Sequence, residues 1–170
     1  MNINTGDITL TDATETSVLY IKNHETCDFV ITALIYNLGN STGAASSAVN
    51  CKFDILRNPV TGAIITNATP VLVPTSSVAS NQNFGSANTY TIDCYKGATA
   101  EVPIVSTGLI TISTLSASNT GRTVVGLGAI TLPKGSSLAI NYTPPTGNSS
   151  QIVQFAIAGY VRTTAVAEPH

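Results

Sequence analysis

The sequence is poor in charged residues. Only 9% of its 170 residues are Asp, Glu, Lys or Arg, against roughly 25% in an average soluble domain. The seven Lys and Arg residues are scattered along the chain, and they form no basic stripe of the kind that binds a nucleic-acid backbone. We therefore expect no nucleic-acid partner. A net charge of −2 also leaves little repulsion between copies of the chain.

A long apolar run is also missing. No segment approaches the roughly 18 apolar residues that a membrane-spanning helix needs. The first residues, Met1–Asp7, show neither the basic start nor the apolar stretch of a secretory signal. We expect no membrane partner and no secretion by this route.

Histidine, the usual general base, is scarce. The chain has only His24, beside Glu25 in an expected turn, and His170; a Ser-His-Asp or Cys-His catalytic system needs an internal histidine. Asp54 and Asp93 are expected on the polar faces of strands, as solvated surface charges rather than as a glycosidase pair. The sequence therefore predicts no catalytic residues and no enzyme.

The cysteines and glycines do not form a metal or cofactor motif. Cys27, Cys51 and Cys94 lack the paired C-x-x-C spacing of zinc ligands. Gly126–Gly128 lacks the third glycine of a dinucleotide site, and a strand kink or bulge is the favoured interpretation. Cys51 and Cys94 alternate in phase with apolar residues, so we expect buried, inert thiols. A Cys51–Cys94 disulfide or an inter-subunit disulfide remains the alternative.

Alternation of apolar and polar residues with a period of two dominates the chain, whereas helix caps and a 3.6-residue period are absent. Cys27–Leu38 is apolar on both faces, which is typical of a central or interface strand. The strands expected from this pattern are Thr16–Lys22, Cys27–Leu38, Val49–Arg57, Ala63–Thr66, Val71–Val73, Thr89–Tyr95, Ile104–Ser113, Arg122–Leu132, Ser137–Thr143 and Gln151–Thr163. They predict an all-β fold, an antiparallel β-sandwich or jelly roll of about nine strands, as one domain over residues 1–170.

Two further predictions concern the segment Leu132–Val161 and the two ends of the chain. Leu132–Val161 consists of two alternating segments around a Pro/Gly/Asn turn, which predicts a β-hairpin. Residues 1–15 and 164–170 show no strand that the core would need, so we expect them to be extended terminal arms that contact neighbouring subunits.

One aromatic residue lies in an otherwise polar loop. Phe84 is flanked by Asn81 and Asn83 within Ser80–Asn88, and these three residues are the candidate partner contact. An aromatic ring in a polar loop usually folds back over the edge of the core, and this is the favoured interpretation of Phe84 itself.

Four turn-and-strand motifs carry a resemblance. SNQNFGSANT (Ser80–Thr89), CYKGA (Cys94–Ala98), LPKGSSLAI (Leu132–Ile140) and YTPPTGN (Tyr142–Asn148) resemble small virion proteins of tailed bacteriophages, of the capsid decoration (cement) or head-fibre type. The resemblance implies a jelly-roll-like sandwich on the outer surface of a capsid. It also implies a homo-oligomer, with a trimer favoured, bound to the major capsid protein and made in the host cytoplasm. It implies no catalytic, cofactor-binding or metal-binding residues.

A receptor- or glycan-binding module of a phage tail or fibre is the alternative function. Glycan-binding sandwiches commonly present exposed aromatic platforms, whereas this chain has no tryptophan and only 6% aromatic residues. The composition therefore favours the structural virion protein.

Overall fold

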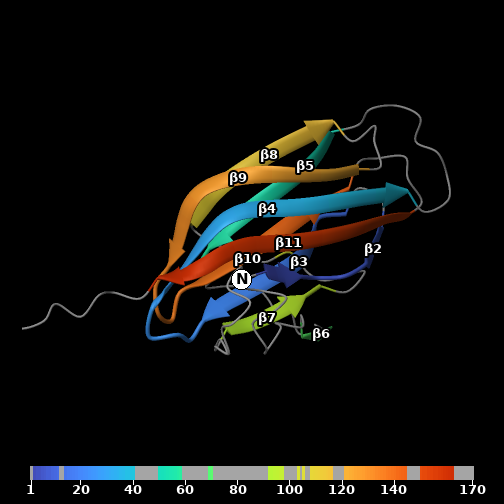
Figure 1. The fold of residues 1–170 in the computed structure, drawn as a ribbon. Helices are drawn as coiled ribbons and strands as arrows, with labels where there is room; N and C mark the ends of the chain where they lie inside the picture. Colours follow the sequence, from blue (N-terminus) through green and yellow to red (C-terminus); the bar gives the residue numbers. More distant parts are fainter. Residues whose placement is uncertain are drawn as a thin grey trace, which may run out of the picture.

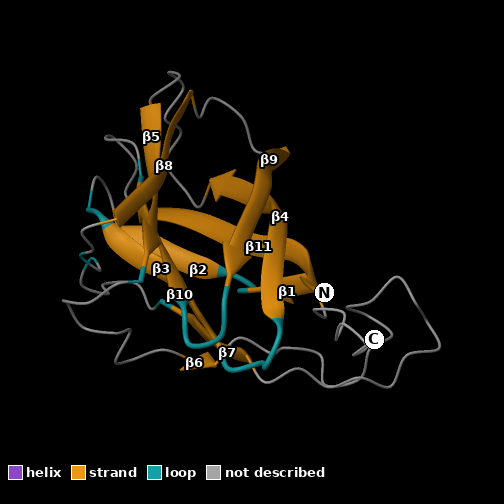
Figure 2. Cartoon of the chain, turned by 90° about the vertical axis from the view of Figure 1, so that its left-hand side faces the viewer, coloured by secondary structure: helices purple, strands orange, loops and turns teal. Residues whose placement is uncertain are grey.

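The computed structural model describes residues 2–11, 14–40, 50–58, 69–70, 92–97, 103, 105, 108–116, 121–144 and 150–162. These residues form strands and short connections, with no helix among them (Figure 1). They contain eleven strands, in two antiparallel sheets that pack face to face (Figure 2). The predicted all-β antiparallel sandwich is therefore confirmed.

Sheet A consists of five strands and sheet B of six. In sheet A, β9 (Gly121–Leu132) pairs with β4 (Asp28–Asn40), β4 with β11 (Ser150–Arg162), and β11 with both β1 (Asn2–Asn4) and β2 (Ile8–Thr11). Sheet B has the order β6 (Thr69–Pro70), β7 (Ile92–Lys96), β3 (Thr16–Asn23), β10 (Ser137–Thr143), β5 (Asn50–Arg57) and β8 (Gly108–Ser116).

The chain crosses repeatedly between the sheets. Strands β2, β4, β9 and β11 belong to sheet A, whereas β3, β5, β8 and β10 belong to sheet B. Their spatial orders are β2-β11-β4-β9 and β3-β10-β5-β8. Strands that follow one another along the chain therefore mostly lie in opposite layers.

An aromatic cluster joins the two layers. Phe53 of sheet B lies 4.8 Å from Tyr36 and 5.5 Å from Phe155, both of sheet A, between ring centroids. Tyr142 of sheet B lies 4.7 Å from Phe53. These tilted and edge-on contacts avoid the unfavourable face-to-face arrangement of two aromatic quadrupoles. The four rings form the centre of a core that draws apolar residues from both sheets.

The expected N-terminal arm is wrong over residues 2–11. β1 and β2 together form an edge of sheet A against β11, and Ile3, Ile8 and Leu10 belong to the main core cluster. A bulge separates the two short strands, where Gly6 has a φ of 64°. This interruption hides the period of two, and for that reason the sequence pattern did not show the strands.

The expected hairpin over Leu132–Val161 is also wrong. Both strands exist, but β10 pairs with β3 and β5, while β11 pairs with β1, β2 and β4. The segment between them begins with two prolines, Pro144 and Pro145, and Pro lacks the donor that a tight hairpin ladder uses. The alternation predicted the strands correctly, but it carries no information about their partners.

Two other expectations from the pattern are confirmed. β4 is a central strand of sheet A, between β11 and β9. The Gly126–Gly128 segment lies within β9 at a shift in the pairing with β4, and Gly128 has a φ of 68°. This conformation favours glycine, as expected for a bulge.

Candidate functional site

The predicted contact residues Asn81, Asn83 and Phe84 lie outside the described residues. The structure therefore does not place them, and the contact loop stays a prediction. Residues 164–170, the expected C-terminal arm, also lie outside the described part.

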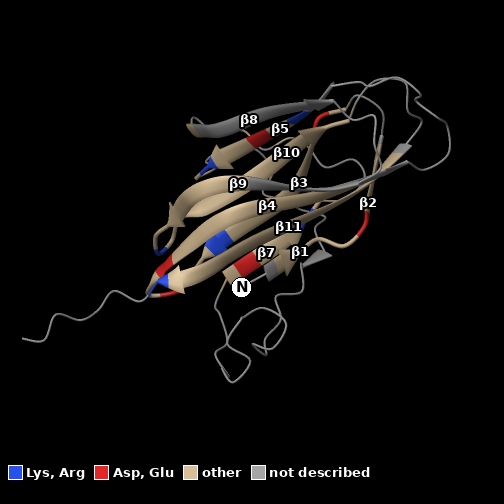
Figure 3. Cartoon of the chain, turned by 45° about the horizontal axis from the view of Figure 1, so that its top comes forward, with Lys and Arg blue, Asp and Glu red and all other residues tan. Residues whose placement is uncertain are grey.

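The strands of sheet A are almost free of charge (Figure 3). The charged residues in them are Asp28 in β4, Arg122 in β9 and Arg162 in β11. Asp28 and Arg162 form an ion pair with each other, with an Nη2–Oδ2 distance of 2.9 Å, where β4 and β11 meet at one end of the sheet. A broad surface of the sandwich therefore presents neutral side chains.

The small side chain of Ala156 forms the floor of a groove on the solvent side of this sheet. Ala156 of β11 lies between Asn4 of β1 and Ile35 of β4 in the register of the sheet. Since an alanine rises only one carbon above the sheet, the longer side chains beside it enclose a shallow groove of about 280 Å³.

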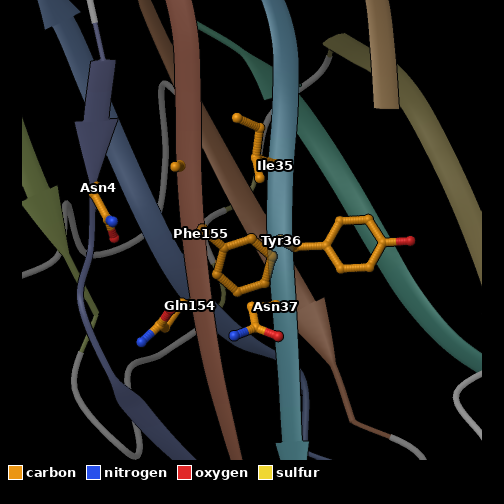
Figure 4. A pocket seen from close by; sticks show the side chains of 7 residues that line it. Asn4, Ile35, Tyr36, Asn37, Gln154 and Phe155 are labelled. Atoms are coloured by element: carbon orange, nitrogen blue, oxygen red, sulfur yellow. The ribbon is translucent and has the colours of Figure 1, made fainter. Parts of the chain in front are cut away.

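Amide side chains form much of the rim of this groove, which we call the amide groove (Figure 4). Gln154 and Asn37 are register partners on β11 and β4, and Asn4 approaches from β1. Oδ1 of Asn4 accepts a hydrogen bond of 2.8 Å from the Gly6 amide, and Nε2 of Gln154 donates to Oδ1 of Asp7. The loop between β1 and β2 therefore orients two of the three amides.

The remaining groups of the amide groove can bind a neutral polar partner. Among the described residues, nothing pairs with Nδ2 of Asn4 or with Oε1 of Gln154, so one is available as a donor and the other as an acceptor, and the exposed Asn37 side chain offers both. Amides of this kind recognise peptide groups or sugar hydroxyls. None of the three is a nucleophile or a general base, so the chemistry of the groove is binding.

An exposed hydrogen-bonded contact with a carboxylate accounts for the internal histidine. His24, exposed as expected, lies with Nε2 2.7 Å from Oδ2 of the exposed Asp93. Within the described residues, no three His, Cys, Asp or Glu side chains gather as metal ligands do. The pair therefore belongs to the surface between β3 and β7.

The thiols follow the prediction where the structure describes them. Cys94 is a free, buried cysteine, and burial, assisted by the Asp93 carboxylate, raises its pKa from 9.0 to about 12. A thiol with such a pKa is protonated and unreactive at neutral pH. Cys27 is a free, half-buried thiol, and the Cys51 side chain lies outside the described part.

The expected exposure of Asp54 is wrong. Asp54 is 7% exposed and lies in a row with Asn141 and Ser17 across β5, β10 and β3. Its Oδ2 pairs with the Lys52 ammonium group at 2.6 Å, whereas its Oδ1 and the Ser17 hydroxyl are buried and have no hydrogen-bond partner in the part of the chain that the structure describes. Alternation placed Asp54 on the side away from the core correctly, but that side of sheet B is itself covered at this row.

The chain matches no protein-family model, no curated protein and no solved structure. None of the described residues belongs to a helix that could span a membrane.

Sequence reasoning missed the residues of the amide groove. Asn4, Asn37 and Gln154 come from three strands that are far apart in the sequence, and only the pairing of β11 with β1 and β4 brings them together. Polar residues inside otherwise apolar strands, such as Gln154 in Gln151–Thr163, were the available signal.

Proposed function

We propose that this chain is a structural protein of a tailed-phage virion, a capsid decoration (cement) protein that binds the outer surface of the shell and stabilises it. The observation that carries the proposal is the nearly uncharged solvent side of sheet A with its amide groove. Interfaces are depleted in charged residues at their centres. A neutral sheet face with hydrogen-bonding amides is therefore suited to lie against another protein.

The order of the strands gives independent support. The two interleaved sets, β2-β11-β4-β9 and β3-β10-β5-β8, are the order that we expect for a jelly roll, and viral capsid domains use this architecture. The support is by analogy of fold, because one fold serves many functions.

The proposed mechanism is linkage between binding and shell stability. A protein that binds the assembled shell but not its separated subunits stabilises the shell by RT ln(1 + [L]/Kd), about 2.7 kcal/mol per site at 100 Kd. Because the proposed contact carries few charges, with the Asp7 carboxylate beside Gln154 at its rim, its affinity should depend only weakly on salt. The homo-oligomer and the contact loop with Asn81, Asn83 and Phe84 belong to the same proposal.

The amide groove also favours one alternative, a receptor- or glycan-binding module of a phage tail or fibre. Its free donors and acceptors could bind sugar hydroxyls, and lectins also use jelly rolls. The two aromatic residues of its lining, Tyr36 and Phe155, are buried in the core, so the groove presents no aromatic platform to a sugar ring and we rank this function second.

A thermal ramp on phage particles tests the proposal. Genome release is compared for particles with the wild-type protein, with the Asn37→Lys variant and without the protein. We expect release at the lowest temperature without the protein, and reduced occupancy for Asn37→Lys, which puts a charge on the rim of the groove. Thr26→Lys adds the same charge to an exposed turn and should behave as wild type.

Other results of the same experiment would contradict the proposal. Particles that lack the protein but remain as heat-stable as complete ones would exclude decoration. If such particles also fail to adsorb to cells, the receptor-binding alternative takes its place.

A further inference from the structure

Each sheet of the sandwich ends in edge strands, whose outward N–H and C=O groups can pair with another chain. Natural proteins usually protect such edges with bulges, prolines, charges or very short strands. The edges described here are β1 with β2, β9, β6 with β7, and β8. They differ sharply in this protection.

Three of these edges are interrupted. The β1–β2 edge is broken at Gly6, with a φ of 64°, and β9 contains the bulge at Gly128, with a φ of 68°. On the opposite side of sheet B, β6 has two residues and ends in Pro70, and the adjacent β7 carries the exposed Asp93. These features limit regular ladders with another strand, and the regular part of β9, Gly121–Gly126, also carries the charged Arg122.

The β8 edge has no such protection over Thr111–Ser116. A register shift against β5 ends at Thr111, and Thr111–Ser116 then pairs residue by residue with Asn50–Ile55. The segment, TISTLS, contains no charge, proline or glycine. Uncharged runs of this length and composition pair readily as strands. Within the described residues, β5 is the only strand that pairs with β8.

We propose that Thr111–Ser116 is a self-pairing edge, which joins β8 of one copy to β8 of a second copy in an antiparallel ladder about a two-fold axis. The two copies of sheet B then form one continuous sheet. The proposal does not depend on binding to a capsid.

The composition of the segment favours a second copy as the partner. In a two-fold ladder centred on Ser113, the opposed pairs are Ser113–Ser113, Ile112–Thr114 and Thr111–Leu115. None of these pairs brings like charges together, and β-branched residues favour strands. A two-fold interface uses the same surface of both copies, so it closes at a dimer rather than at the trimer that the resemblance implies.

Charge substitutions at Thr114 test the proposal. Thr114 is the register partner of Lys52, whose side chain is 47% exposed. In the ladder centred on Ser113, lysine at 114 in both copies places like charges at diagonal positions on the same face of the sheet, and so does glutamate. We expect the wild type to be a dimer in analytical ultracentrifugation. Thr114→Lys and Thr114→Glu should each raise the dimer dissociation constant at least about fivefold, and an equimolar mixture of the two variants should restore dimers.

Thr131→Lys is the matched control. It adds the same charge at an exposed position of β9, the edge that the Gly128 bulge interrupts, and should leave the dimer intact. Circular dichroism verifies that every variant is folded.

Three outcomes would overturn the proposal. The first is a wild type that stays monomeric up to about 1 mM, the affinity of a very weak complex. The second is an oligomer that neither Thr114 variant weakens, which would include a trimer built on another surface. The third is an equal loss of dimer in Thr131→Lys.

Heat stability of particles carrying a monomeric Thr114 variant distinguishes this proposal from shell binding, which can persist without the dimer.

Discussion

The hydroxyl group of Tyr142 in sheet B donates a hydrogen bond of 2.6 Å to Oε1 of Gln151 in sheet A. Both residues are buried, at 0% and 3% exposed, so water cannot replace the donor if it is removed. We expect Tyr142→Phe to lower the free energy of unfolding by about 1–3 kcal/mol, the usual cost of an unsatisfied buried polar group. Urea denaturation of Tyr142→Phe, Gln151→Met and the double variant measures the coupling. Strictly additive losses would show that the bond contributes nothing.

Gly159 provides a second test, because the backbone of β4 approaches it closely. A Cβ atom at this position would lie 2.2 Å from the Val30 carbonyl oxygen. Gly159→Ala should therefore destabilise the protein by about 1–3 kcal/mol, as overpacking does. Gly126→Ala is the control, because a Cβ there meets no atom within 4 Å. Equal melting temperatures for the two variants would contradict the packing around β11.

The N-terminal strands should be required for folding. Leu10 is fully buried in the main core cluster, whereas Thr9 is exposed. We expect Leu10→Ala to cost about 2–5 kcal/mol and Thr9→Ala to stay within about 0.5 kcal/mol of wild type. Deletion of residues 1–11 should abolish the cooperative thermal transition. A truncated protein that melts like the full chain would contradict this requirement and support the extended arm that the sequence pattern predicts.

Alkaline pH should weaken the fold through Cys94. The pKa of this thiol is about 12 in the folded protein, against an ordinary value of 9.0. Between these two values the unfolded chain loses a proton that the folded protein keeps, so the free energy of unfolding falls as pH rises. Below pH 9 the Cys94 thiol is protonated in both the folded and the unfolded state, so its contribution to the free energy of unfolding is fully present. Urea titrations across this range should show a steeper fall for wild type than for Cys94→Ala, and parallel curves would contradict the burial of the thiol.

Most strands could be predicted because alternation is a local property. The segments predicted as Ser137–Thr143 and Gln151–Thr163 correspond closely to β10 and β11. The strands with which they pair could not be predicted, because the crossing of the chain between the two sheets depends on long-range packing. β1 and β2 could not be predicted either, because the alternation is interrupted at Gly6. The buried Asp54 illustrates the same limit, since alternation gives the side of a strand but not what covers that side.

The candidate site was less predictable than the fold. Its amides come together only through the pairing of β11 with β1 and β4, which no spacing in the sequence reveals. The contact loop with Asn81, Asn83 and Phe84 was the feature that local composition could suggest, and it stays a prediction.

The position of β11 has a consequence for synthesis of the chain. β11 lies between the N-terminal strands and β4, and Asn2 is the register partner of Ala158. Pairings of such sequence separation form slowly, and this one cannot form until β11 has left the ribosome. Until then β1 and β2 lack the strand with which they pair, so this edge of sheet A is completed late during synthesis.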